Sequence, residues 1–74
     1  MSGSGEYNIG DVVIFKPEGR YSKYFGGRLA IIEHMAYGSD GKLHCRVRWL
    51  EPVNYFGRVA TVSDFSLDRF SKNG

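Results

Sequence analysis

The sequence predicts a small all-β domain, and three observations support this prediction. Residues 42–49, KLHCRVRW, alternate polar and apolar side chains, which is the pattern of a strand with one buried face. Residues 38–41, GSDG, come just before this strand and are typical of a hairpin turn. Five Tyr, five Phe and one Trp among 74 residues supply aromatic side chains, which strands favour and which bury large areas. We therefore expect one domain with an aromatic core.

The chain begins with an expected leader, followed by a strand. Residues 1–8, MSGSGEYN, are rich in Ser and Gly, and we expect them to form a flexible leader outside the fold. A turn at residues 9–11 then opens the domain, which we expect to span residues 9–71. The apolar run that follows predicts a strand over residues 12–16. Pro17 ends this strand because proline cannot donate to a β-ladder.

A loop and a second strand are expected next. Residues 17–27, PEGRYSKYFGG, combine aromatic and basic side chains and end in a Gly pair suited to a sharp bend. We predict a loop there, with Phe25 buried. Residues 28–37, RLAIIEHMAY, have apolar side chains at helical spacing. No N-cap residue precedes them, however, and a hairpin turn follows, so we predict a strand.

The register of the central hairpin depends on the length of its turn. A two-residue turn at residues 40–41 would set Glu33 opposite Arg48 and Tyr37 opposite His44. A three-residue turn would invert the parity, and with it the face on which each side chain lies. The sequence leaves both registers open.

The last third of the chain predicts a loop, two strands and a short helical turn. Residues 52–57, PVNYFG, are expected to form a connecting loop, and residues 58–62, RVATV, a fourth strand. The Ser63-Asp64 pair is typical of a helix cap, so residues 63–65 predict one turn of 3₁₀ helix. Residues 66–71 are expected to form the last strand, and the remaining residues, 72–74, a tail.

Together these elements describe a five-stranded SH3-like barrel. It would have a long aromatic loop after the first strand, a hairpin in the middle and a short 3₁₀ turn before the last strand. We expect the last strand to close the barrel, because closure protects most strand edges from pairing with other chains.

Length and composition argue against several classes of function. A chain of 74 residues is near the lower limit for independent folding and leaves little room for a substrate cavity. Cys45 is the single cysteine, which excludes an intramolecular disulfide or a Cys-based zinc site and predicts a buried, inert thiol. His34 and His44 lack the carboxylate spacing of a metal site, and no serine is paired with an oriented base. We predict no enzyme activity, no catalytic residue, no metal and no cofactor.

The sequence also lacks the usual signals for membrane insertion. No apolar run approaches the roughly 20 residues needed to span a bilayer. The N-terminus lacks the charged-then-apolar pattern of a signal peptide. We expect a monomeric domain in the cytoplasm, without direct membrane insertion.

Several segments carry a resemblance to a known family: residues 12–18 (VVIFKPE) followed by Tyr21, residues 47–49 (VRW), residues 53–57 (VNYFG), and the closing Val62, Phe65 and Leu67. In this order, between Gly10 and Phe70, the chain resembles the PsaE family, subunit IV of photosystem I, among the SH3-like electron-transport accessory proteins. The resemblance implies a non-catalytic subunit on the stromal or cytoplasmic face of a membrane complex. It also implies docking of an acidic carrier such as ferredoxin, in which Arg48 would take part.

We therefore predict a docking or adaptor subunit that binds a protein complex through an acidic contact surface of that complex. The basic side chains of the 42–49 strand face outward, and Arg offers a fork of donors that suits carboxylates. The predicted partner-binding residues are His44, Arg46 and Arg48 from this strand, Lys16, Arg20, Tyr21, Lys23 and Tyr24 from the first strand and loop, and Tyr55 and Phe56 from the second loop. The alternative interpretation is a solvated outer face in which Glu33 pairs with the arginines.

Other functions also remain open. Residues 10–13, GDVV, and Gly27 before an apolar strand are similar to KOW and Tudor-type barrels. That similarity implies binding of nucleic acid, transcription machinery or modified peptides, for which the aromatics could form a cage. A small inhibitor of a host protein complex would need the same surface as an adaptor. The net charge of +2 permits attraction to nucleic acid or to an acidic protein.

Overall fold

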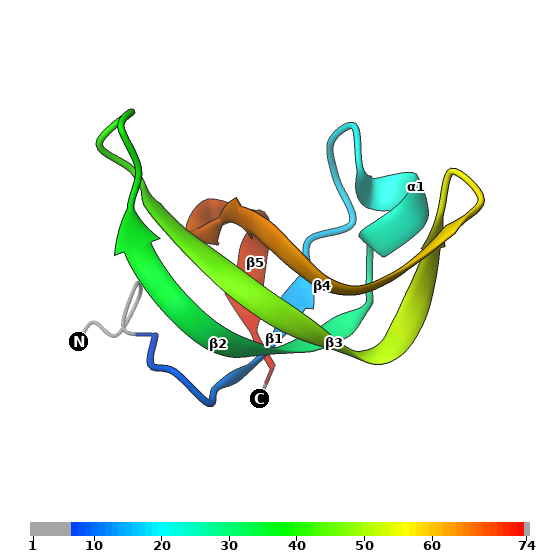
Figure 1. Cartoon of the computed structure of the whole chain (residues 1–74), viewed down its shortest axis with the longest axis horizontal. Coiled ribbons are helices and arrows are strands. Elements are labelled where there is room, and N and C mark those ends of the chain that lie inside the picture. Colours follow the sequence, from blue (N-terminus) through cyan, green and yellow to red (C-terminus); the bar gives the residue numbers. More distant parts are fainter. Residues whose placement is uncertain (1–6, 74) are drawn as a thin grey trace.

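The structure, a computed structural model, describes residues 7–73 as one five-stranded antiparallel sheet (Figure 1). Its strands are β1 (Val12–Phe15), β2 (Leu29–Tyr37), β3 (Leu43–Tyr55), β4 (Arg58–Ser66) and β5 (Phe70–Lys72). A one-turn helix, α1 (Ser22–Phe25), joins β1 to β2, and a 3₁₀ helix, η1 (Leu67–Arg69), joins β4 to β5. The strand order is β4-β3-β2-β1-β5. The predicted all-β class is confirmed, as is the 3₁₀ turn before the last strand.

The sheet is open, with β4 and β5 at its two edges. The prediction that the last strand closes a barrel is therefore wrong. β5 has only three residues, and all three pair with β1, from Val13 opposite Lys72 to Phe15 opposite Phe70. So short a strand offers little length for a second ladder to β4. In place of closure, η1 carries the chain across the gap between the two edges (Figure 1).

The hairpin between β2 and β3 has the three-residue turn. The Gly41 N–H donates to the Gly38 carbonyl at 3.0 Å, and the Gly38 N–H donates to the Lys42 carbonyl at 2.9 Å. Tyr37 therefore pairs with Leu43, so of the two registers that the sequence left open the structure has the three-residue one. Farther along, the register shifts by one residue at Glu33, which is left without a direct partner as in a β-bulge. The strand predicted for β2 is confirmed over the helical alternative.

β3 continues through the segment predicted as a loop. Residues 53–55 pair with residues 58–60 of β4, so the hairpin turn contains only Phe56 and Gly57. The predicted loop over residues 52–57 is therefore wrong. Pro52 is tolerated because it lies in a break of the ladder, where residues 49–52 face Thr61 alone. Proline has no N–H and would remove a hydrogen bond from a regular ladder. In such a break there is no ladder hydrogen bond to lose.

Two short helical segments also differ from the prediction. α1 lies within the expected loop, where the Ser22 hydroxyl donates to the Gly19 carbonyl at 2.8 Å and the Gly26 N–H donates to the Ser22 carbonyl at 2.8 Å. The 3₁₀ turn comes after residues 63–65, which stay in β4. The reason is local: Ser63 accepts a hydrogen bond from the Trp49 indole at 2.9 Å, which helps hold this part of β4 on β3.

The core lies on the concave side of the curled sheet and is mainly aromatic and β-branched. It contains the buried residues Val13, Phe15, Phe25, Ala30, Ile32, Cys45, Val47, Trp49, Val53, Leu67 and Phe70. On β3 the pattern found in the sequence is confirmed, since Cys45, Val47 and Trp49 are buried while Arg46 and Arg48 are exposed. The predicted burial of Phe25 is confirmed as well.

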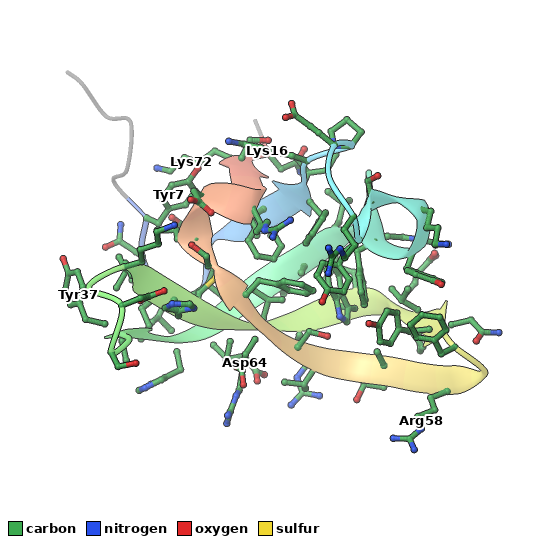
Figure 2. The ribbon with its side chains drawn as sticks, turned by 90° about the horizontal axis from the view of Figure 1, so that it is seen from above. Tyr7, Lys16, Tyr37, Arg58, Asp64 and Lys72 are labelled. Atoms are coloured by element: carbon green, nitrogen blue, oxygen red, sulfur yellow. The ribbon has the colours of Figure 1, made fainter. Side chains whose placement is uncertain are left out.

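The two ends of the described chain meet beside β5. Tyr7, which we assigned to the leader, packs against the core and donates its hydroxyl to the Phe70 carbonyl at 3.4 Å. The Lys72 ammonium, assigned to the tail, lies 5.5 Å from the centre of the Tyr7 ring (Figure 2). Residues 1–6 of the predicted leader lie outside the described residues. Within residues 7–73, no helix has the length and apolar composition required to cross a membrane.

Candidate functional site

The structure places His44, Arg46 and Arg48 in one outward row on β3, which we call the β3 row. Arg46 lies opposite Asp64 of β4 and donates to its two carboxylate oxygens at 3.0 and 3.3 Å. Arg48 donates from Nε to the Glu33 carboxylate at 2.5 Å. Both guanidinium groups lie on the surface, with 55% and 56% of their side chains exposed. Each arginine of the row thus already has a carboxylate partner.

The third member of the β3 row is paired as well. His44 Nε2 lies 3.2 Å from both carboxylate oxygens of Asp40 in the hairpin turn. The Lys42 N–H, and after it His44, hold the pKa of Asp40 below its ordinary value. In the same way the Arg46 hydrogen bonds lower the pKa of Asp64 and raise that of Arg46. Each side chain of the β3 row therefore lies beside a carboxylate. This arrangement agrees with the alternative interpretation, a solvated outer face with ion pairs.

Six of the ten predicted partner-binding residues come together elsewhere, around a cavity of about 340 Å³. This cavity, which we call the aromatic groove, is lined by Arg20, Tyr21, Lys23, Tyr24, Tyr55 and Phe56. The first four residues lie in α1 or in the two positions just before it, and the last two belong to the β3–β4 hairpin. The long β3–β4 hairpin makes this possible, because it brings Tyr55 and Phe56 to the side of α1 (Figure 1).

The rings of the aromatic groove pack on one another at close distances. The Tyr24 ring centre lies 4.8 Å from that of Tyr55 and 5.0 Å from that of Phe56. Tyr55 in turn lies 5.3 Å from the buried Phe25, which stacks on Trp49 at 4.9 Å. A continuous column of rings thus joins the groove to the core. Such packing fixes the shape of the surface before any partner binds.

Phe56 is the most exposed ring of the groove and has an unusual backbone. Its φ is +51°, and that of Gly57 is +77°, so the two residues form a hairpin turn with both central dihedrals positive. Asn, Asp and Gly are the residues that favour such a turn, and a bulky side chain there is an outlier. Nevertheless 72% of Phe56 is exposed to solvent, so little core packing compensates for the strain.

The charges of the groove differ from those of the β3 row. The Lys23 ammonium lies 5.2 Å from the Tyr24 ring centre, and the Arg69 guanidinium lies 5.7 Å from the Tyr21 ring centre. Neither Arg20 nor Lys23 forms an ion pair with a carboxylate in the part of the chain that the structure describes. These two cations are therefore available to an acidic ligand.

One hydroxyl group of the groove, that of Tyr55, has a shifted pKa. Burial, and after it the neighbouring phenols of Tyr21 and Tyr24, raise the pKa of Tyr55 above its ordinary value. Tyr55 therefore keeps its proton at neutral pH and can donate a hydrogen bond to an acceptor such as a carboxylate.

Sequence analysis did not identify Arg69, which lies beside the aromatic groove, and it wrongly grouped Lys16 with the residues of that groove. Arg69 reaches Tyr21 because η1 follows β4 directly, and no spacing in the sequence links the two residues. Lys16 was predicted with the first loop but lines two other cavities, both together with Asp68. The ten predicted residues thus fall into the aromatic groove, the β3 row and the separate Lys16.

The structure bears on two further sequence predictions, the metal site and the Cys45 thiol. No group of three His, Cys, Asp or Glu side chains is placed to hold a metal ion among residues 7–73. Burial, with a smaller contribution from the Asp64 charge, raises the pKa of the Cys45 thiol to about 11, so it is not a nucleophile at neutral pH. Comparisons of the chain with protein-family models, with curated proteins and with solved structures found no match.

Proposed function

We propose that this protein is a non-catalytic docking module that binds an acidic segment of a partner protein in the aromatic groove. One observation carries the proposal: rings from two separate segments converge on one cavity, together with two cations that have no carboxylate partner among residues 7–73. Aromatic residues and arginine are the side chains most enriched where protein interfaces gain their binding energy.

The strain at Phe56 supports a binding role for the hairpin tip. Residues in sparsely populated backbone regions cost about 1–3 kcal/mol each and cluster at functional sites. Phe56 combines this cost with 72% exposure, so the folded monomer gains little from its ring. A partner that covers the ring would gain the burial of a large aromatic surface.

The charges indicate the chemistry of the partner. Arg20 and Lys23 line the groove without a carboxylate partner among the described residues, and Arg58 follows directly after the hairpin turn. An acidic segment with apolar or aromatic side chains would satisfy both the cations and the rings. A positively charged ligand, such as a methylated lysine, would be repelled by the same cations.

The PsaE resemblance gives a second candidate surface, the β3 row with Arg48. Half of the Arg48 side chain is exposed, which favours this candidate. An acidic carrier such as ferredoxin would, however, have to replace Glu33 as its partner. We therefore rank the aromatic groove above the β3 row.

An NMR titration separates these candidates. The probes are an acidic peptide with spaced Leu and Phe residues, the same peptide with Gln and Asn in place of the acids, an acidic ferredoxin, and single-stranded RNA. We expect the acidic peptide to shift the amides of Arg20, Lys23 and Phe56, and the neutral peptide to bind more weakly.

Other results would replace the proposal. Shifts confined to Arg46 and Arg48 with ferredoxin would favour the β3 row instead. Binding of RNA alone, with affinity that falls steeply as salt rises, would favour the nucleic-acid alternative. A lack of shifts in the groove with any acidic probe contradicts the proposal.

A further inference from the structure

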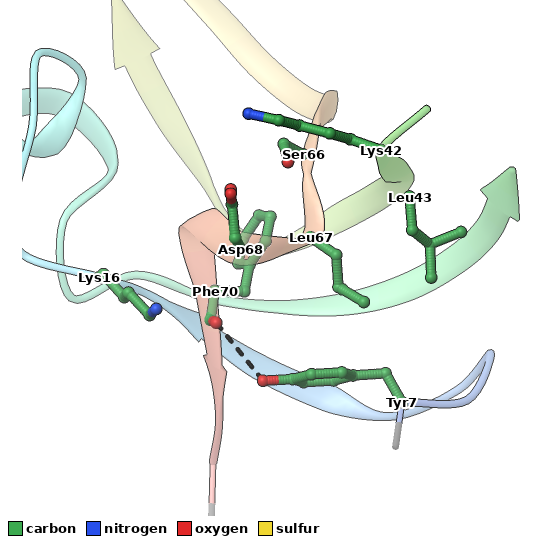
Figure 3. A pocket seen from close by; sticks show the side chains of 8 residues that line it. All are labelled: Tyr7, Lys16, Lys42, Leu43, Ser66, Leu67, Asp68 and Phe70. Atoms are coloured by element: carbon green, nitrogen blue, oxygen red, sulfur yellow. Dashed lines mark hydrogen bonds between the residues drawn. The ribbon is translucent and has the colours of Figure 1, made fainter. Parts of the chain in front are cut away.

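We propose a second binding site, for a small amphipathic carboxylate, in the groove between the β2–β3 hairpin and η1. This groove, which we call the Tyr7 groove, has a volume of about 500 Å³ and shares no residue with the aromatic groove (Figure 3). Small-molecule sites typically have volumes of about 300–1,000 Å³ and are mostly apolar. The inference does not depend on the proposed function.

The apolar wall of the Tyr7 groove is already in place. Leu67 and Phe70 are buried core residues that reach the groove from η1 and β5. Leu43 lines it from the start of β3 and is only partly buried. The Tyr7 ring is positioned by its hydroxyl, which donates to the Phe70 carbonyl at 3.4 Å (Figure 3). An aliphatic or aromatic body of a ligand would cover these side chains and remove apolar surface from water.

The rim of the groove favours an anion. Lys16 and Lys42 line it from different segments, and neither pairs with a carboxylate within residues 7–73. Asp68 is the one acidic side chain among the lining residues, so the lining carries two positive charges against one negative charge. A ligand with a single carboxylate complements this excess.

The backbones that carry the two lysines are fixed. The Lys16 N–H donates to the Arg69 carbonyl at 2.9 Å, which ties the end of β1 to η1. The Lys42 N–H donates to the Asp40 carboxylate at 3.0 Å, which closes the hairpin turn. The ammonium groups move on flexible stems, but their attachment points flank the apolar wall. The expected ligand is therefore a monocarboxylate with an apolar body, such as a medium-chain fatty acid.

The test compares octanoate with 1-octanol, which has the same chain without the charge. We expect octanoate to shift the methyl signals of Leu43 and Leu67 in NMR titrations and to bind more tightly than 1-octanol. Lys16→Gln and Lys42→Gln should each weaken octanoate about two- to fivefold, because exposed charge pairs contribute up to about 1 kcal/mol. Asp68→Asn should strengthen octanoate by a similar factor.

The controls separate recognition of the charge from general effects. None of the three variants should change the affinity for 1-octanol. Arg28→Gln removes one positive charge outside the Tyr7 groove and should leave octanoate binding unchanged. Equal binding of octanoate and octanol, unchanged affinity in Asp68→Asn, or shifts confined to the aromatic groove would each overturn the proposal. Thermal unfolding of each variant verifies that it is folded.

Discussion

Phe56 shows how one residue can weaken the fold and serve the surface at the same time. It is the first of two turn residues with positive φ, a place where Asn before Gly is strongly favoured. We predict that Phe56→Asn raises the free energy of unfolding by about 1 kcal/mol, because it relieves strain and removes a ring that is mostly exposed. Thermal unfolding should show a melting temperature higher by about 4–8 °C.

The same substitution should weaken binding of the acidic peptide in the aromatic groove. Phe56→Ala is the matched control, since it removes the ring but keeps a side chain at positive φ. It should weaken binding without raising the melting temperature. If Phe56→Asn is more stable and binds the peptide as well as the wild type, the ring has no role in docking. If it is less stable, the strain assigned to the turn is wrong.

At the scale of the element, the position of α1 depends on Gly26, the residue directly after the helix, which packs closely against the backbone. A Cβ built on Gly26 would lie 2.5 Å from the Ser22 carbonyl oxygen and 3.3 Å from the Pro17 Cα. Both are backbone atoms, so the helix itself would have to shift. We predict that Gly26→Ala destabilises the protein by about 1–3 kcal/mol, as other overpacked sites do.

The readouts of Gly26→Ala are chemical denaturation and Trp49 fluorescence. Phe25, the last residue of α1, stacks on the indole at 4.9 Å with an interplanar angle of 15°, so a shifted helix changes the environment of the indole. Ser22→Ala is the control in the same turn, because it removes an exposed hydrogen bond to Gly19 and should cost no more than about 1 kcal/mol. Equal stability of the two variants would show that α1 adapts without cost.

At the scale of the whole molecule, the parts that the sequence predicts are those that follow from local alternation. The buried face of Cys45, Val47 and Trp49 follows from the side-chain alternation. The strand character of β2 follows from the missing N-cap and the hairpin turn after it, against a helical spacing of its apolar side chains, and the structure has both features. The continuation of β3 through Pro52 could not be predicted from local alternation, because a proline is accepted within a strand only where the partner strand leaves a break in the ladder. Such a break is a property of the paired strands and is not visible in either strand alone.

The sequence predicted most residues of the candidate site but not which of them lie together in space. The sequence identified the aromatic and basic residues of the two loops, and six of them line one groove. It also put the β3 row in the same surface and gave pairing with Glu33 only as the alternative interpretation. In the structure Glu33 pairs with Arg48, and Asp64, which the sequence did not link to the row, pairs with Arg46. These pairs depend on the registers of β4 and β2, which two irregularities shift. Figure 2 shows Asp64 on the outer side of β4, away from Lys16 and Tyr7.

The stability of the whole molecule should fall at alkaline pH because of Cys45 in the middle of the core. The thiol is 2% exposed, and its pKa rises from an ordinary value of 9.0 to about 11 when the protein folds. Above pH 9 the unfolded chain loses this proton while the folded chain retains it, so the unfolded state binds fewer protons and gains stability relative to the fold. The loss should approach about 1.4 kcal/mol per pH unit until the folded thiol also ionises. Cys45→Ala lacks this titration, so urea unfolding of both proteins from pH 7 to 10.5 should show the wild type losing stability more steeply than the variant. Parallel curves would mean that the buried thiolate carries no penalty and that water reaches the centre of the sheet.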